Sequence, residues 1–230
     1  METAMTHRGT IIRRPMADGA EIDIYHVEPA GRRRGGLVLI QEIFGLTDHI
    51  RDQCDRFAGH GYEVLAPALY DREAPGLNAP YTPEGIALGM KVAREQHPFE
   101  LSVTDTQSCI DMLEGAGPVF ITGYCYGGSV TYAAAARCRG LAAASGYYGG
   151  MIPRMADERP RCPTILHFGR KDAGIPLDAV EAFAKARPEV EVHLYDAGHG
   201  FSSDRRTDYD EPSARLALER TLALFQAHGG

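Results

Sequence analysis

Three residues in this sequence have the types and the chain order of a nucleophile, an acid and a base. Cys125 is the centre of a G-x-C-x-G string at residues 123–127, which has the spacing of the G-x-S-x-G nucleophile elbow with sulfur in place of oxygen. Asp172 follows in a Gly-Arg-Lys-Asp turn, and His199 in the string Ala-Gly-His-Gly-Phe. In these roles His199 would move the thiol proton, and Asp172 would orient and stabilise the imidazolium. The chemistry that these residues indicate is nucleophilic acyl transfer.

The segments around Cys125 predict the turn that such a nucleophile needs. Residues 118–122 form a short apolar run typical of a buried strand, and the Ala-rich residues 129–137 predict a helix. Glycines on both sides permit a turn too tight for a Cβ, and the positive end of the following helix favours a thiolate. The alternative is a glycine-rich turn in which the cysteine is only a small buried hydrophobe.

Strand-like and helix-like segments alternate along the chain. Predicted strands cover residues 10–14, 21–27, 37–40, 62–66, 118–122, 141–145, 164–168 and 190–195, and predicted helices cover 49–59, 83–96, 98–114, 129–137, 177–186 and 211–227. This pattern predicts an α/β fold with a mostly parallel central sheet, an N-terminal antiparallel hairpin and helices on both faces. Asp172 and His199 each follow a predicted strand, at the sheet edge where ligands bind. The order nucleophile, acid, histidine is that of the α/β-hydrolase fold, although Asp172 alone would read as a turn residue.

An oxyanion hole is expected beside the thiol. Its donors would be the backbone N–H of Tyr126, directly after the nucleophile, and that of Ile43, in the loop after the strand at residues 37–40. The same loop carries Glu42. A carboxylate in a water-poor pocket would oppose ionisation of the thiol and keep it resistant to oxidation; the alternative is a solvated loop glutamate.

Composition limits the partners and the compartment. A formal charge of −7 argues against nucleic acid as a partner, and no apolar run has the roughly 18 residues of a membrane span. The N-terminus lacks the apolar core of a signal peptide. Five cysteines, an odd number without a C-x-x-C pair, indicate free thiols in a reducing cytoplasm and no metal site or other cofactor.

The length of 230 residues suits one continuous domain over residues 1–230. We expect flexible tails at residues 1–9 and 228–230. Five aromatic side chains are expected to line an apolar substrate pocket, although core packing would use the same residues: Phe44, Tyr126, Tyr147, Tyr148 and Phe201.

Seven short segments resemble the dienelactone hydrolase (carboxymethylenebutenolidase) family. They are Gln41-Glu42-Ile43-Phe44-Gly45, Ile50-Arg51-Asp52, Gly61-Tyr62-Glu63-Val64-Leu65-Ala66-Pro67, Leu69-Tyr70, Gly123-Tyr124-Cys125, Gly146-Tyr147-Tyr148-Gly149 and Gly198-His199. The resemblance extends from about residue 10 to residue 226. It implies an α/β-hydrolase with the triad Cys125, Asp172 and His199, in which Glu42 accepts the thiol proton when substrate binds. It also implies that a lactone of an unsaturated dicarboxylic acid is opened through an acyl-thiol enzyme.

The chain departs from this family at the positions that hold the substrate carboxylate. The family has an arginine four residues after the histidine, where this chain has Ser203, and Gly200 stands where serine is usual. Arg205 and Arg206 follow closely and are the candidate replacements.

A thiolate favours acyl groups with acidic leaving groups, so we expect a small-molecule lactone, ester or thioester as the substrate. Two other functions stay open. One is a general carboxylesterase or thioesterase with the same triad, and the other is a non-catalytic module in which the thiol binds a ligand or senses redox state.

Overall fold

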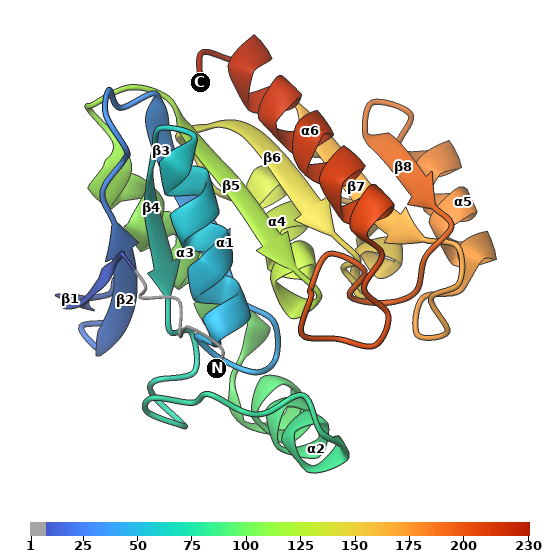
Figure 1. Ribbon diagram of the computed structural model, residues 1–230, viewed down its shortest axis with the longest axis horizontal. Helices are drawn as coiled ribbons and strands as arrows, with labels where there is room; N and C mark the ends of the chain where they lie inside the picture. The colour runs from blue at the N-terminus through green and yellow to red at the C-terminus, as the bar shows by residue number, and fades with distance from the viewer. Residues whose placement is uncertain (1–7) are drawn as a thin grey trace, which may run out of the picture.

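The computed structural model describes residues 8–230 and contains a sheet of eight strands (Figure 1). The strands are β1 (Thr10–Pro15), β2 (Glu21–Val27), β3 (Gly35–Ile40), β4 (Tyr62–Pro67), β5 (Val119–Tyr124), β6 (Leu141–Tyr147), β7 (Thr164–Gly169) and β8 (Glu191–Tyr195). Their order across the sheet is β1-β2-β4-β3-β5-β6-β7-β8. The pairs β1–β2 and β2–β4 are antiparallel, and all pairs from β4 to β8 are parallel. The expected fold class is therefore confirmed.

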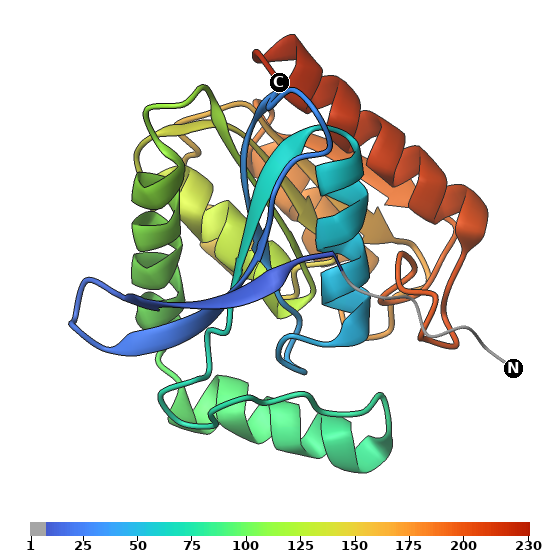
Figure 2. The same ribbon diagram turned by 60° about the vertical axis from the view of Figure 1, so that its left-hand side comes forward.

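Helices cover both faces of the sheet. In the described part of the chain they are α1 (Asp48–Gly59), α2 (Pro83–Lys91), α3 (Phe99–Leu113), α4 (Tyr126–Arg137), α5 (Leu177–Ala186) and α6 (Glu211–Ala227), with a π-helix η1 (Val92–Gln96) and a 3-10 turn η2 (Ile152–Met155). Figures 1 and 2 show α1 and α6 on one face and α3, α4 and α5 on the other, while α2 lies beyond the end of β4. Every residue of β3, β5 and β7 is buried, as expected for parallel strands covered on both faces.

The structure differs from the predicted helices in two places. The helix expected over residues 83–96 ends at Lys91 and continues as η1, in which the N–H of His97 donates to the carbonyl of Val92 at 2.8 Å. This widened turn holds the His97 side chain in the interior, where none of it is exposed. The helix after the elbow begins at Tyr126 rather than at residue 129, because its glycines can adopt helical backbone despite their low propensity.

The expected N-terminal tail falls mostly outside the described residues 8–230. At the other end, the carbonyl of Gly230 accepts a hydrogen bond from Arg34 at 3.0 Å, so the last residue packs against the body of the protein. No helix between residues 8 and 230 combines the length and the apolar character that crossing a bilayer requires.

Candidate active site

Cys125 occupies a sharp turn between β5 and α4. Its backbone has φ 56° and ψ −113°, which places a non-glycine residue in the sparsely populated positive-φ region. A Cβ at Gly127 would lie 2.4 Å from the carbonyl oxygen of Ile40, and a Cβ at Gly123 would lie 2.4 Å from the carbonyl oxygen of Gly127. Both flanking glycines are therefore required by close backbone contacts, and the turn predicted from the sequence is present.

The three residues expected to form a triad are in contact. The Nε2 atom of His199 lies 3.1 Å from the Cys125 sulfur, and its Nδ1 lies 2.6 Å from Oδ2 of Asp172. The other carboxylate oxygen, Oδ1, accepts the N–H of Gly174 at 2.8 Å. Since only 1% of the Asp172 side chain is exposed, this carboxylate is held rigidly against the imidazole.

These contacts favour the charged form of His199. Burial alone would lower the pKa of the imidazole, but the Cys125 sulfur and the Asp172 carboxylate outweigh burial and raise the pKa to about 10. The imidazolium is thus stabilised from both sides at neutral pH. This arrangement can hold a thiolate beside an imidazolium and can return a proton to a leaving group.

The two expected oxyanion-hole donors are available. Ile43 lies in the turn after β3, and Tyr126 is the first residue of α4, where backbone N–H groups have no intrahelical acceptor. Within residues 8–230, neither N–H has a hydrogen-bond partner. Gln41 supports the first loop, because its amide nitrogen donates to the carbonyl of Glu42 and its oxygen accepts the N–H of Leu69, both at 3.3 Å.

Glu42 is a buried residue, so the alternative of a solvated loop glutamate is wrong. None of it is exposed. The hydroxyl of Tyr81 donates to its Oε2 at 2.8 Å, and Arg206 donates to its Oε1 at 3.4 Å. Burial and then the Glu42 charge raise the pKa of Tyr81, which keeps the phenol a donor. In the described part of the chain Glu42 makes no direct contact with the Cys125 sulfur, and the Arg206 cation offsets its negative charge.

The structure separates the two candidate arginines. Arg206 faces the site, with its guanidinium carbon 6.0 Å from the centre of the Phe44 ring. Gly200 (φ 80°) lies against it, and a Cβ at this position would come within 2.5 Å of Nε of Arg206. Arg205 instead pairs with Asp52 at 2.9 Å and borders a cavity of about 180 Å³ beside the start of α1, which Tyr81 also lines.

The predicted aromatic lining is only partly at the site. Phe44 packs against Tyr81, with ring centres 4.6 Å apart. Phe201 is buried behind Tyr148, at 5.3 Å between ring centres. Tyr147 does not line a pocket: it is buried in the core, and its hydroxyl bonds to Thr221 of α6 at 2.7 Å.

Tyr148, expected with Tyr147 among the lining residues, does lie at the site: it has φ 37°, and its ring lies 5.1 Å from that of His199. Tyr81 had no signal as a site residue in the sequence. Tyr81 comes from an irregular Pro-rich loop, and only the folded chain brings its hydroxyl to Glu42.

The parallel sheet, the nucleophile elbow and the Cys125–His199–Asp172 contacts together define a protein of the α/β-hydrolase class. The model of the dienelactone hydrolase family matches residues 22–229, so the chain belongs to that family. It is therefore a hydrolase of ester or lactone bonds.

The relatives agree with this assignment. The chain is 34% identical over 210 residues to a Synechocystis protein assigned as a carboxymethylenebutenolidase. The matched residues are 83% of this chain and 85% of the relative. It is 30% identical over 215 residues to the carboxymethylenebutenolidase of Pseudomonas sp. strain P51, and the matched residues are 87% of this chain and 88% of the relative. A Klebsiella pneumoniae protein assigned as a dienelactone hydrolase has a similar crystal structure, with a TM-score of 0.80, 29% identity and coverage of 94% and 99%.

Proposed function

We propose that the chain hydrolyses activated lactones or esters of small acids through an acyl-thiol enzyme on Cys125. The observation that carries this proposal is the unbroken series of contacts from Asp172 to His199 to the Cys125 sulfur, at 2.6 and 3.1 Å. The sulfur stands on a strained elbow at the start of α4, where the helix end favours a thiolate.

The residues present supply each step of this reaction. The Cys125 thiolate attacks the acyl carbon, and the N–H groups of Ile43 and Tyr126 stabilise the oxyanion that forms. Collapse of this intermediate breaks the bond to the leaving oxygen, which takes its proton from the His199 imidazolium. Water then attacks the thioester while His199 accepts its proton, and the carboxylic acid is released with the thiol restored.

The proposed substrate is a lactone or ester that bears a carboxylate. Arg206 is the cation that faces the site and is 18% exposed at its side chain, whereas Arg205 is occupied by Asp52 outside it. Phe44 lies beside Arg206 and is itself buried. A thiolate is itself a good leaving group, so enol lactones, aryl esters and thioesters fit the site better than amides do.

We also propose that Glu42 gates the thiol. In this proposal the thiol keeps its proton until substrate binds, while His199 already carries its own. A substrate carboxylate that competes for Arg206 would release Glu42, which then accepts the thiol proton and leaves the thiolate that attacks. In the absence of substrate, Glu42→Gln should raise the rate of Cys125 alkylation by iodoacetamide several-fold near pH 7, because the Arg206 cation would no longer be offset and would favour the thiolate. The extent of alkylation is measured as the loss of esterase activity. The control is Glu63→Gln, which breaks an ion pair with Arg33. An unchanged rate would reduce Glu42 to a structural loop residue.

A substrate panel tests the proposed function. We expect Cys125-dependent hydrolysis of cis-dienelactone, p-nitrophenyl acetate and a short acyl thioester, each lost in Cys125→Ala. A lactone preference of orders of magnitude would support Arg206 as the carboxylate-binding residue. Hydrolysis that persists in Cys125→Ala, or the absence of activity on all three substrates, would contradict the proposal and leave ligand binding or redox sensing by the thiol.

A general carboxylesterase or thioesterase is the second candidate. The observation that favours it is Ser203, where the family has an arginine, together with the lack of arginine between Arg72 and Arg94. Comparable activity on all three substrates of the panel, each dependent on Cys125, would select this function.

We place the enzyme in a reducing compartment, the cytoplasm. All five cysteines are free thiols in the structure. Since Cys125 must be reduced to attack a substrate, an oxidising compartment would act against the proposed chemistry.

A further inference from the structure

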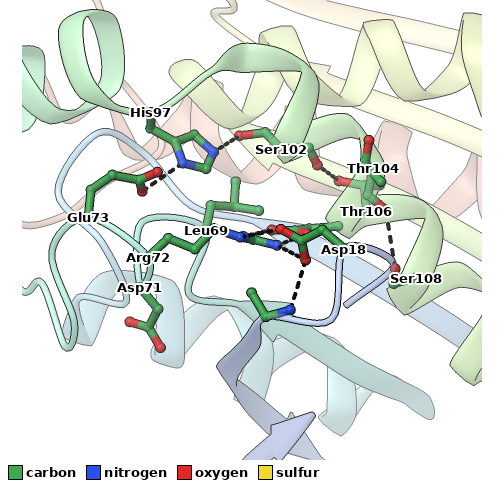
Figure 3. A network of polar contacts seen from close by, with 12 residues as sticks. Asp18, Leu69, Asp71, Arg72, Glu73, His97, Ser102, Thr104, Thr106 and Ser108 are labelled. Carbon is green, nitrogen blue, oxygen red and sulfur yellow. Dashed lines mark hydrogen bonds and ion pairs between the residues drawn. The ribbon is translucent and has the colours of Figure 1, made fainter. Parts of the chain in front are cut away.

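A chain of buried hydrogen bonds ends beside Cys125. Oε2 of Glu73 lies 2.9 Å from Nδ1 of His97, and Nε2 of His97 lies 2.9 Å from the hydroxyl of Ser102. The Ser102 hydroxyl lies 2.8 Å from that of Tyr126, the residue after Cys125. Figure 3 shows the first part of this chain, from Glu73 through His97 to Ser102. We call Glu73, His97, Ser102 and Tyr126 the elbow relay.

The donors and acceptors of the elbow relay depend on the tautomer of His97. When Nδ1 of His97 donates to Glu73, its Nε2 accepts the Ser102 hydroxyl proton, and the Ser102 oxygen can accept the proton of Tyr126. Burial raises the pKa of Tyr126 to about 12, which keeps its phenol protonated. Each polar group of the relay thus has a partner.

The elbow relay is attached to a rigid support. Arg72, next to Glu73, donates to both carboxylate oxygens of the buried Asp105 on α3, at 2.6 and 2.8 Å. It also donates to Asp18 at 2.9 Å, as Figure 3 shows. Bidentate pairs of this kind fix geometry as well as supplying energy. The ring of Tyr70 packs on those of His97 and Tyr126, with ring centres 5.2 and 5.6 Å away.

The same loop supports the other side of the oxyanion hole. Leu69, four residues before Glu73, donates its N–H to Gln41, which in turn donates to the carbonyl of Glu42, the residue before Ile43. Residues 69–73 are thus linked by side-chain hydrogen bonds to both backbone segments that carry the proposed oxyanion donors.

We infer that Glu73, His97 and Ser102 are positioning residues that fix Tyr126, and with it the backbone N–H that stabilises the oxyanion. This inference rests on the proposed function. Ser102 and His97 have the contacts of a second catalytic pair, but Ser102 is fully buried and its hydroxyl is used by two partners, so Ser102 has no access to a substrate. The geometry instead assigns the relay to the alignment of the elbow, where small misplacements have large effects on rate.

The test is to remove one hydrogen bond of the elbow relay while keeping the backbone and the thiol. In Tyr126→Phe and in Ser102→Ala, the burst-phase rate of acylation by p-nitrophenyl acetate should fall about tenfold, a fraction of the loss when an oxyanion donor is removed outright. The apparent KM should change little. Reaction of Cys125 with methyl methanethiosulfonate forms no oxyanion, so its rate, followed by loss of esterase activity, should stay within twofold of wild type.

Tyr132→Phe is the matched control. It lies on the same helix α4 and loses a partly buried hydrogen bond, from its hydroxyl to the carbonyl of Glu158 at 2.7 Å, but it is not part of the relay. Its acylation rate should equal that of wild type at a comparable loss of thermal stability.

Acylation within twofold of wild type in both relay variants would overturn the inference, and so would equal losses in acylation and in thiosulfonate reaction. A loss in Tyr132→Phe as large as that in Tyr126→Phe would do the same. Failure of the proposed function is recognised separately, because in that case the esterase activity would survive Cys125→Ala. Failure of the relay inference would instead leave that activity dependent on Cys125.

Discussion

Cys125→Ser should lower kcat for p-nitrophenyl acetate by at least about 1,000-fold, on the scale of losses seen when a catalytic nucleophile is removed. A serine fits the strained elbow, because it has nearly the same size and makes the same backbone contacts. The hydroxyl, however, is far less acidic than a thiol, so the contact with His199 at 3.1 Å would no longer hold an ionised nucleophile. The loss therefore comes from chemistry and not from the fold.

The measurement is steady-state kinetics together with thermal unfolding. We expect the midpoint of unfolding to stay within a few degrees of wild type, and Cys162→Ser, which changes a partly buried thiol of the loop before β7, to keep full activity. A Cys125→Ser variant within tenfold of wild type would show that the sulfur is not the attacking atom.

The second large effect is expected from Asp172→Asn. This substitution keeps the shape of the side chain but replaces a carboxylate by an amide, which can hold the imidazole in the wrong tautomer; such changes cost about 10⁴-fold in kcat in a serine triad. The pKa of His199 should fall from about 10, because one of the two negative groups that raise it against the effect of burial is lost. The imidazole then loses its proton at a lower pH than in wild type.

Both expectations can be read from one preparation. Imidazole NMR of ¹⁵N-labelled protein gives the titration of His199, and the same sample gives kcat. Asp178→Asn, in the first turn of α5, is the control that removes a carboxylate outside the contacts of His199. An unchanged His199 titration, or a kcat above about a tenth of wild type, would contradict the assignment of Asp172.

The parts of the site that the sequence predicted are those set by local pattern. A strand, a glycine-flanked turn and a helix place Cys125 from neighbouring residues alone, and the two later strands place Asp172 and His199 at the same sheet edge. The buried strands β3 and β5 follow from short apolar runs in the same way. These features need no knowledge of which distant segments meet.

What the sequence did not predict depends on distant contacts or on single backbone angles. Tyr81 reaches Glu42 from 39 positions away, across a loop without regular structure. His97 enters the interior because η1 adds an extra residue to a helical turn, which residue pattern does not indicate. Tyr147 and Tyr148 were both expected at the pocket, yet Tyr147 bonds to α6 and only Tyr148 lies beside His199.

The close approach of Gly200 to Arg206 couples these two positions. A side chain at position 200 would occupy the space of the Arg206 guanidinium stem, and the φ of 80° disfavours any L-residue there. A substitution of Gly200 should therefore displace Arg206 from Glu42, although the arginine itself is unchanged. Any redesign of the specificity of this site has to treat positions 200 and 206 as one unit.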